Sequence, residues 1–288
     1  MQPQEPIKDI VVIYHAYCID GFGAAWAAWK RLGDTATYIP ALYRDEFPEG
    51  IVEKEVYILD FCFKADITKD LALKNKKLVL IDHHVSEKDI IESVENHKFA
   101  LDKSAAKLTW EYFHPNIPVP ELIEYISDSD MTEHTLPNWR EVEEYIYAQD
   151  YSFESYDDVY YELEKNKKGI VKIGTALAKQ IDKVVDRHIE KARLVSFEGY
   201  EVYACNAPTI ILDKLGEKLN EKKGPFTILY RFERDNLRVL FRGNGTVDVS
   251  KIAKKYGGGG HHDSAGIRFK DKFPLSFLLS GEKDSANL

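Results

Sequence analysis

Short apolar runs alternate with helical segments along the first hundred residues, and this alternation restricts the fold more than any other feature. The runs DIVVIYH at residues 9–15, EVYILDF at 55–61 and KLVLIDHH at 77–84 are rich in β-branched residues and have the length of buried strands. The segment GFGAAWAAWKRLG at residues 21–33 predicts a helix that ends at a glycine. Strands that alternate with helices predict a parallel sheet covered by helices on both faces.

The pattern changes after a long helical segment. Residues 104–165 predict mostly helices, and residues 169–194 predict one amphipathic helix. Its length suits a connector between domains, and a long core helix fits the periodicity equally well. Beyond it, YEVYACN, FTILYRFE and LRVLFRG predict strands. We therefore expect an α/β protein with a parallel-sheet domain at residues 1–168, a connector helix at 169–195 and a smaller α+β domain at 196–288.

Composition excludes several other classes of protein. No run of 18 apolar residues is present that could span a membrane, and the start MQPQEPIKDIVVIY lacks the basic and apolar regions of a signal peptide. The three cysteines, Cys18, Cys62 and Cys205, are too few and too scattered for a disulfide framework. A cytoplasmic protein that does not enter a membrane is the default expectation.

The net charge of −9 argues against binding of long duplex DNA. From Glu201 onward the chain holds 15 Lys and Arg against 11 Asp and Glu, so the acidic excess lies in the first part. An acidic first part and a mildly basic second part would suit a metal site and an anion clamp. A random distribution of surface charge explains the same counts equally well.

Acidic and imidazole side chains follow the predicted strands at the point where each strand ends. His15 ends the first strand, Asp60 ends another, and Asp82 with His83 and His84 ends the next. The carboxyl ends of parallel strands meet at one edge of a sheet, where ligands bind. A single His or Asp at a strand end is more often a cap or a surface residue. The coincidence at several strand ends favours a site for divalent Mn, Fe or Mg.

Asp20 follows the first strand closely and adds a further carboxylate to this edge. Carboxylates that are crowded together repel one another unless a cation neutralises them. Two metal ions that share a bridging carboxylate satisfy this requirement. Such a pair can activate water near neutral pH and stabilise a phosphoryl transition state. The sequence therefore predicts a two-metal centre at the rim of the sheet.

A glycine run with two histidines, GGGGHHDSAG, occupies residues 257–266 of the second domain. Four glycines let the backbone approach a ligand closely, and their N–H groups can bind an anion, although a flexible loop is an equally good interpretation. Arg242 stands at the end of a predicted strand, where its guanidinium could hold a phosphate. Together these residues indicate a substrate-holding domain.

These motifs, taken in order, resemble those of the DHH phosphoesterase family. The DHH triplet at residues 82–84 resembles the family's signature, and GGGGHHDSAG resembles the glycine-rich motif of the DHHA1 domain found in many members. HAYCIDGFGAAW, YILDFCF and YISDSD are similar to the first, second and fourth motifs of the family. The resemblance covers nearly the whole chain and implies a parallel-sheet DHH domain joined by a long helix to a smaller α+β DHHA1 domain.

The resemblance implies a role for each matching residue. Two divalent cations would be bound, with Mn2+ as the first expectation and Mg2+, Fe2+ or Zn2+ as alternatives. The implied metal ligands are His15, Asp20, Asp60 as the bridging group, His83 and Asp128. The implied catalytic group is Asp82, His83 and His84, in which Asp82 orients its neighbours and His84 contacts the phosphate. The implied substrate-binding residues are Arg242, Gly257, Gly258, Gly259, Gly260 and His261.

Two positions leave alternatives open. Cys18 stands where the family usually has an aspartate, and a thiolate is softer than Mn2+ or Mg2+ prefers. Cys18 is therefore either a ligand of an ion such as Zn2+ or Fe2+, or a small packing residue. The fourth motif offers both Asp128 and Asp130. The place of Asp128 after an apolar helix favours it as the ligand, and Asp130 would then cap the next segment.

The expected activity is hydrolysis of short oligonucleotides or dinucleotides to mononucleotides by metal-activated water, with short single-stranded RNA or DNA as substrate. The nearest alternative is a phosphatase for 3′-phosphoadenosine 5′-phosphate, and a pyrophosphatase or polyphosphatase is less favoured. A nucleotide-binding sensor with weakened catalysis and a single-stranded nucleic-acid binding module are alternatives from other classes. The tyrosine-rich stretch at residues 145–161 is compatible with a homodimer face.

Overall fold

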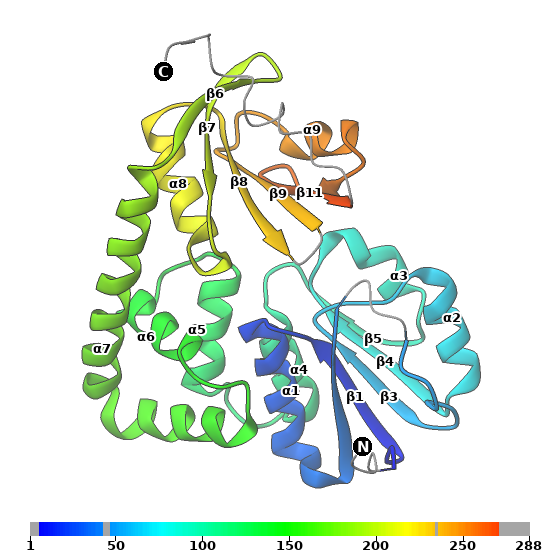
Figure 1. Cartoon of the computed structure of the whole chain (residues 1–288). Coiled ribbons are helices and arrows are strands. Elements are labelled where there is room, and N and C mark those ends of the chain that lie inside the picture. Colours follow the sequence, from blue (N-terminus) through cyan, green and yellow to red (C-terminus); the bar gives the residue numbers. More distant parts are fainter. Residues whose placement is uncertain (1–5, 43–46, 234–235, 271–288) are drawn as a thin grey trace, which may run out of the picture. The chain divides into compact units, whose positions relative to one another are not determined.

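The apolar runs of the first hundred residues form five parallel strands in the order β2-β1-β3-β4-β5 (Figure 1). The computed structural model describes residues 6–42, 47–233 and 236–270, and these strands belong to a first unit that ends at Ala178. The strands are β1 (Ile10–His15), β2 (Ala36–Ala41), β3 (Glu55–Leu59), β4 (Lys77–Asp82) and β5 (Asn96–Phe99). Every neighbouring pair in this sheet is parallel, as the alternation of strands and helices predicts.

Helices cover both faces of this sheet, because successive strand residues point to opposite sides. On one face Val12 and Val79 pack with helices α1 (Ile19–Leu32), α4 (Ala105–Phe113), α5 (Glu121–Asp130) and α6 (Trp139–Tyr147). On the other face Val11 and Leu80 pack with α2 (Ala65–Lys74) and α3 (Lys88–Glu92). Short 3-10 turns, η1 (Gly33–Thr35) and η2 (Val85–Glu87), follow α1 and β4. Both faces of the sheet are therefore buried, and the ends of its strands are the places left for a functional site.

Helix α7 (Phe153–Ile189) is the longest element, and the division between the two units falls inside it, after Ala178. It is kinked at Asn166, where φ is −145° and ψ is 40°. The predicted helix at residues 169–194 corresponds to the second half of α7, but the helix ends at Ile189 and Arg193 already begins the next strand. The three-part division at residues 168 and 195 stays a prediction.

The second unit, from Lys179 onward, is built on a mixed sheet in the order β10-β11-β9-β8-β7-β6. Among the described strands of this sheet, only the neighbours β7 and β8 pair in parallel. Helix α8 covers one face through Leu215, and α9 covers the other through Ile252. The predicted fold class, a parallel α/β domain and a smaller α+β domain, is confirmed. The elements are β6 (Arg193–Phe197), β7 (Tyr200–Asn206), η3 (Thr209–Ile211), α8 (Leu212–Lys222), β8 (Phe226–Glu233), β9 (Asn236–Gly243), α9 (Val249–Lys255), β10 (Gly259–Gly260) and β11 (Ser264–Lys270).

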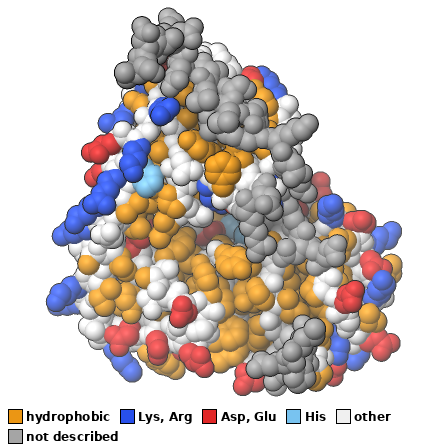
Figure 2. All heavy atoms as spheres, in the orientation of Figure 1, with side chains coloured by type: hydrophobic (Ala, Val, Ile, Leu, Met, Phe, Trp, Pro, Cys, Tyr) orange, Lys and Arg blue, Asp and Glu red, His pale blue; other side chains and the backbone are white. Residues whose placement is uncertain are grey.

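The surface mixes charged and apolar side chains, and Figure 2 shows hydrophobic side chains among acidic and basic ones on one face. Within the tyrosine-rich stretch, Tyr147, Tyr151 and Tyr161 are exposed. A homodimer formed through this stretch stays a prediction. In the part of the chain that the structure describes, none of the helices has both the length and the apolar character needed to cross a bilayer.

Candidate metal centre

The carboxyl ends of β1, β3 and β4 lie side by side at one edge of the first sheet. The last paired residues of these strands lie at the same level of the sheet. His15, Asp60 and Asp82 each come directly after one of them, so they also lie at one level. Asp60 has a φ of +65°, in the left-handed region that side chains disfavour by about 1–2 kcal/mol. Its N–H donates to the Ile81 carbonyl at 3.0 Å, which holds this conformation. Strained backbone of this kind concentrates at functional sites.

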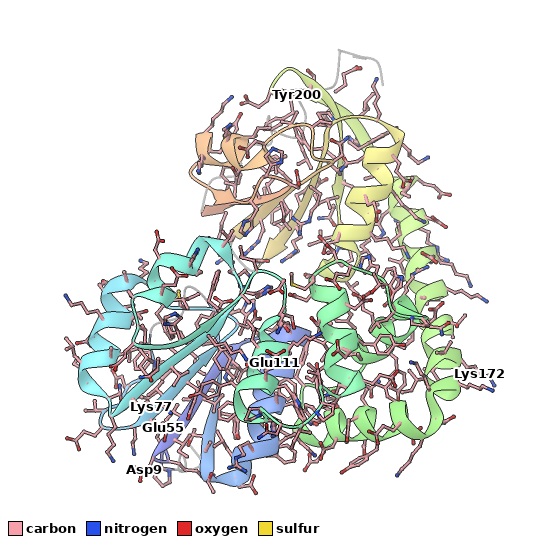
Figure 3. The ribbon with its side chains drawn as sticks, turned by 180° about the vertical axis from the view of Figure 1, so that it is seen from behind. Asp9, Glu55, Lys77, Glu111, Lys172 and Tyr200 are labelled. Carbon is pink, nitrogen blue, oxygen red and sulfur yellow. The ribbon has the colours of Figure 1, made fainter. Side chains whose placement is uncertain are left out.

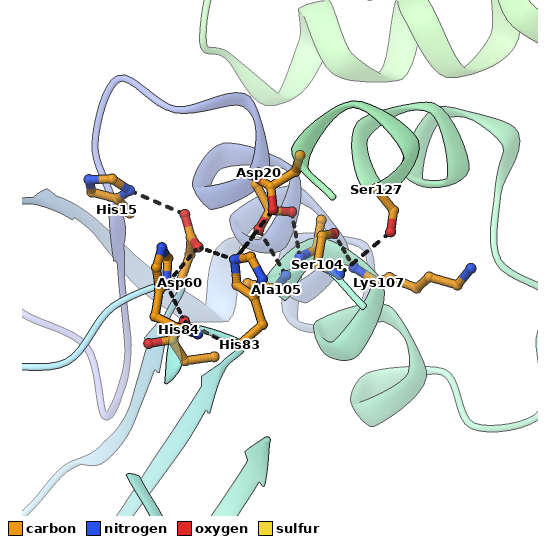
Figure 4. A network of polar contacts seen from close by, with 12 residues as sticks. His15, Asp20, Asp60, His83, His84, Ser104, Ala105, Lys107 and Ser127 are labelled. Atoms are coloured by element: carbon orange, nitrogen blue, oxygen red, sulfur yellow. Dashed lines mark hydrogen bonds and ion pairs between the residues drawn. The ribbon is translucent and has the colours of Figure 1, made fainter. Parts of the chain in front are cut away.

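Asp60 lies at the centre of a cluster of side chains that come from separate connections (Figure 4). Its Oδ2 is 3.2 Å from His15 Nδ1, and its Oδ1 is 3.6 Å from His83 Nε2. His83 Nε2 is also 3.3 Å from Asp130 Oδ2 and 3.8 Å from Asp20 Oδ2. The structure thus brings together four of the predicted metal ligands and Asp130, the alternative of the fourth motif.

Acidic side chains have different partners at the two edges of this sheet. At the amino ends of the strands, Lys77 Nζ is 3.0 Å from Glu55 Oε1, and Lys54 Nζ is 3.1 Å from Asp9 Oδ1. Figure 3 shows Asp9, Glu55 and Lys77 at this edge. At the carboxyl ends, no lysine or arginine among the described residues forms an ion pair with the carboxylates of the cluster. The cluster therefore concentrates negative charge whose described ion-pair partners are imidazoles.

Asp20 is held by the first N–H groups of helix α4. Its Oδ2 accepts a hydrogen bond from Ala105 N at 2.8 Å, and its Oδ1 accepts one from Ala106 N at 2.9 Å. Ser104 is the N-cap of this helix. The N-terminus of a helix stabilises an anion, so a fully buried carboxylate is tolerated here. The sequence missed this support, because a serine before an apolar helix indicates a cap but not the group that the helix holds.

Asp82 organises the loop that follows β4. Its Oδ1 accepts hydrogen bonds from His83 N at 2.7 Å and from His84 Nδ1 at 2.7 Å. Burial alone would lower the pKa of His84, but the hydrogen bond with Asp82 and the charge of Asp82 raise it above its usual value. Asp82 thus fixes the orientation of His84 and favours its charged form. Asp82 itself is completely buried.

Helix α5 presents its two aspartates in different directions, since residues two apart on a helix point about 200° apart. Asp128 Oδ1 accepts hydrogen bonds from the N and the Oγ1 of Thr135, each at 2.8 Å, and so stabilises the turn after α5. Asp130 reaches the cluster instead, with its Oδ2 3.3 Å from His83 Nε2. The structure therefore places the alternative residue, and not the favoured one, beside the predicted ligands.

Cys18 lies beside the cluster at the start of α1. It is the N-cap residue of this helix, with extended backbone angles. Its Sγ, a ring nitrogen of His15 and a carboxylate oxygen of Asp60 all lie within 4.8 Å of one another. Gly21 permits the tight connection from β1, because a Cβ at this position would be only 2.3 Å from the carbonyl oxygen of His15.

The close approach of these groups shifts their pKa values. Burial raises the pKa of Asp60, yet the hydrogen bond with His15 and the nearby imidazole of His83 outweigh it and lower the pKa to about 2. Burial and the neighbouring acids raise the pKa of Asp20 well above its usual value, and burial raises that of Asp130 to about 6. Burial lowers the pKa of His83, but Asp60, Asp20 and Asp130 together raise it to about 9. Without a cation, the cluster retains protons at neutral pH.

The donor atoms of the cluster fit divalent cations. Three groups have donor atoms within 4.8 Å of one another, and Asp60 and His83 each belong to two of them: Asp60, Asp82, His83 and His84; His15, Cys18 and Asp60; and Asp20, His83 and Asp130. Buried polar atoms are normally hydrogen-bonded. Asp82 Oδ2, His83 Nε2 and Asp130 Oδ2 are among the buried atoms that make no hydrogen bond within the described residues. Carboxylate and imidazole donors suit Mg2+, Mn2+, Fe2+ and Zn2+.

Arg242 lies near the end of β9 in the second unit and lines a cavity of about 420 Å³. Its Nε donates to Asp213 Oδ1 at 2.5 Å, and its carbonyl accepts a hydrogen bond from Asn220 Nδ2 at 2.9 Å. Asn220 and Asn244 also line this cavity. The guanidinium is thus presented among polar groups, where an anion could compete with Asp213 for it.

The glycine run packs closely against β11. A Cβ on Gly258 would be 2.2 Å from the carbonyl oxygen of Gly266, and one on Gly260 would be 2.5 Å from that of Ser264. His261 follows with an exposed side chain, and its N–H donates to the Ser264 carbonyl at 2.7 Å. Backbone packing is therefore one reason for the glycines. Their predicted role in substrate binding, and that of His261, stay predictions.

Most of the second unit matches a known domain family. Residues 202–280 match the family model of the DHHA1 domain. This match agrees with the resemblance of GGGGHHDSAG to the glycine-rich motif of that domain. A protein of Acanthamoeba polyphaga mimivirus is 29% identical over 284 residues, which cover 90% of this chain and 67% of that relative.

Solved structures share the fold at low sequence identity. An exopolyphosphatase-related protein from Bacteroides fragilis superposes with a TM-score of 0.59 at 12% identity, over 95% of this chain and 90% of that one. RecJ from Thermus thermophilus in complex with Mn2+ gives 0.54 at 11% identity, over 93% of this chain and 50% of RecJ. The pGpG-specific phosphodiesterase PggH from Vibrio cholerae gives 0.52 at 13% identity, over 92% and 94%. This chain therefore spans about half the length of RecJ.

The metal-free protein should lose stability as the pH rises. The pKa is raised from 3.8 to about 6 for Asp130 and from 6.5 to about 9 for His83, so the folded state binds more protons than the unfolded chain across this range. We expect the free energy of unfolding in EDTA to fall between about pH 4 and about pH 9 by a few kcal/mol. Urea denaturation across this range measures it, and added Mn2+ should stabilise more at the alkaline end.

Two variants check the origin of this slope. Asp130→Asn removes the carboxylate that faces His83 and should flatten the pH dependence of the free energy of unfolding in EDTA. Asp89→Asn, an exposed carboxylate on α3, should leave the slope unchanged. An Asp130→Asn protein with the wild-type slope would contradict the coupling between Asp130 and His83.

Proposed function

We propose that this protein is a metal-dependent phosphodiesterase that hydrolyses short oligonucleotides or dinucleotides to mononucleotides. The observation that carries the proposal is the position of Asp60, whose two carboxylate oxygens lie beside His15 and beside His83. A carboxylate that bridges two cations needs this arrangement. The DHHA1 match supports a phosphoesterase. The fold shared with a pGpG-specific phosphodiesterase supports a dinucleotide among the substrates, and that shared with RecJ bound to Mn2+ supports a divalent ion.

The ligands divide into two groups that share Asp60. In this proposal Asp130 takes the role predicted for Asp128, because its carboxylate faces His83. Divalent cations bound here would act as Lewis acids on phosphoryl oxygens and would lower the pKa of water beside the scissile phosphorus. The proposed ligands are His15 and Asp60 for one ion, and Asp20, Asp60, His83 and Asp130 for the other.

His84 is the proposed contact to the phosphate. Its Nδ1 donates to Asp82 Oδ1 at 2.7 Å, which fixes the plane of the ring. The raised pKa of His84 favours the charged imidazolium, which can stabilise the negative charge added to the phosphate during attack. Asp82 is a positioning residue, since its Oδ1 is engaged with the backbone and ring of the loop after β4.

The second unit would hold the part of the substrate away from the scissile bond. Arg242 lines a polar cavity, and its guanidinium can pair with a phosphate or a base edge in a forked geometry. The exposed His261 and the backbone of residues 257–260 would contribute further contacts. Such a domain selects substrates by their terminal nucleotide, which agrees with a preference for short chains.

Asp60→Asn should lower the rate of hydrolysis of a short RNA in Mn2+ by about 1,000-fold or more. The reason is that the shared side chain would no longer neutralise two cations. Glu55→Gln is the matched control. It removes a carboxylate of β3 at the opposite edge of the sheet, where Glu55 pairs with Lys77. Its turnover should equal that of the wild type. Release of mononucleotides from RNAs of two to five nucleotides is the measurement.

The substrate panel for this assay separates the proposed function from its alternatives. It contains dinucleotides, 3′-phosphoadenosine 5′-phosphate and pyrophosphate. Release of inorganic phosphate from the second without cleavage of dinucleotides would favour the phosphatase. Metal binding with no turnover of any member would favour the sensor and contradict the proposal.

The two aspartates of α5 should give different defects. Asp130→Asn should lower kcat/KM by about 100-fold or more, since the group facing His83 loses its charge. Asp128→Asn should lower the free energy of unfolding by about 1–3 kcal/mol, because Asp128 holds the turn at Thr135, and should retain most of the metal affinity. Metal titration and urea denaturation of both variants distinguish the roles. The opposite pattern would contradict this assignment and would identify Asp128 as the ligand.

Arg242→Lys should raise KM about tenfold with little change in kcat, because lysine cannot reproduce the forked contact of a guanidinium. Arg231→Lys is the matched control, since Arg231 lies on the neighbouring strand β8 and pairs with Glu233. It should leave KM unchanged. Equal KM values for wild type and Arg242→Lys on dinucleotides would remove Arg242 from the substrate site.

A further inference from the structure

The three cysteines of the chain lie in different surroundings. Cys205 belongs to an apolar cluster of the second unit, and its Sγ lies 3.4 Å from the carbonyl oxygen of His188. Cys62 belongs to an apolar cluster of the first unit and donates to Glu87 Oε2 at 3.1 Å. None of the apolar clusters of the described residues includes Cys18. Packing explains Cys62 and Cys205 but not Cys18.

The thiol of Cys18 is placed as a ligand would be. Its Sγ, a His15 ring nitrogen and an Asp60 carboxylate oxygen lie within 4.8 Å of one another. Bonds of about 2.0–2.3 Å to one Zn2+ ion set its donor atoms about 3–4 Å apart. His15 Nδ1 and Asp60 Oδ2, at 3.2 Å, already have this spacing. Three different donor types therefore converge at one point of the rim.

The surroundings of the thiol favour a cation. A carboxylate oxygen of Asp60 lies within 4.8 Å of the thiol, and its negative charge favours a cation at this position. Coordination exchanges the S–H bond for a bond from sulfur to the metal and releases the proton to solvent. No group is oxidised or reduced.

We propose that Cys18 Sγ is a direct ligand of the ion held by His15 and Asp60, and that this thiolate makes the position prefer Zn2+, Fe2+ or Co2+ to Mn2+ or Mg2+. The inference rests on the metal centre of the proposed function and goes further in assigning one of its ions. The group of Asp20, His83 and Asp130 offers only oxygen and imidazole donors, which suit Mn2+ or Mg2+. The centre is then a mixed-metal site with one thiolate position.

Cobalt substitution tests the sulfur contact directly. Metal-free full-length protein is titrated with Co2+ and its absorption spectrum is recorded. A thiolate bound to Co2+ gives an intense near-ultraviolet charge-transfer band, whereas carboxylate and imidazole ligands give only weak visible bands. We expect the intense band in the wild type and its loss in Cys18→Ser, with the visible bands retained because the remaining ligands still bind.

Cys205→Ser and Cys62→Ser are the matched controls, and both should keep the intense band. The inference is overturned if the band survives in Cys18→Ser, or if the wild type binds Co2+ without it. It is overturned together with the metal centre if the wild type does not bind Co2+ at all. Far-ultraviolet circular dichroism of Cys18→Ser confirms that the variant is folded, and Cys18→Ala replaces it if it is not.

Metal preference gives a second readout. The dissociation constants of Mn2+ and Zn2+ are measured by chelator competition in wild type and in Cys18→Asp. Both constants refer to the position that binds Zn2+ more tightly, and the ratio of the Mn2+ constant to the Zn2+ constant is compared between the two proteins. Replacing the thiolate by a carboxylate should lower this ratio about 100-fold, which is a change in favour of Mn2+. An unchanged ratio overturns the preference.

The failure of the inference and that of the proposed function are distinguishable. A wild type that shows the charge-transfer band but hydrolyses no member of the substrate panel refutes the activity and keeps the ligand assignment. A wild type that cleaves dinucleotides without ever showing the band refutes the ligand assignment and keeps the activity.

Discussion

Electrostatic repulsion among carboxylates at the carboxyl edge of the first sheet is the constraint on which the rest of the structure depends. Asp20 and Asp82 are completely buried, and Asp60 is 1% exposed. Their described ion-pair partners are imidazoles. Buried like charges cannot all remain ionised without a counter-charge, so the folded chain holds protons where cations would otherwise lie. The demand for positive charge is therefore built into the fold.

Separate backbone devices hold the members of this cluster in place. The N-terminus of α4 binds Asp20, Asp82 binds the loop that carries His84, and the absence of a side chain at Gly21 lets α1 begin close to His15. Each of these interactions fixes one loop at the ends of the strands, and none of them depends on the identity of the residue at position 18. The donor set can therefore vary there while the frame of the site remains.

The sequence predicts well that His15, Asp60 and the residues after β4 lie close together, because parallel strands deliver them to one end of the sheet by topology alone. It favours Asp128 over Asp130, whereas the structure places Asp130 beside His83. Apolar periodicity locates the buried stripe of α5, but the partner of each aspartate depends on where the next turn and the loop after β4 lie in space. The glycine run shows a related limit, since close packing on β11 and contact with a ligand favour the same residues.

Asp60 belongs to two donor groups, so ions at the two proposed positions would share the charge of one carboxylate. An ion that arrives first at either position reduces the negative potential left for the other, and by thermodynamic reciprocity each ion lowers the affinity for its partner equally. In the proposed two-metal centre, occupancy would be stepwise. A half-filled form would persist when divalent metal is scarce, and the second ion would bind only at a higher concentration. Loading of the centre would then be spread over a wider range of metal concentration than loading of two independent sites.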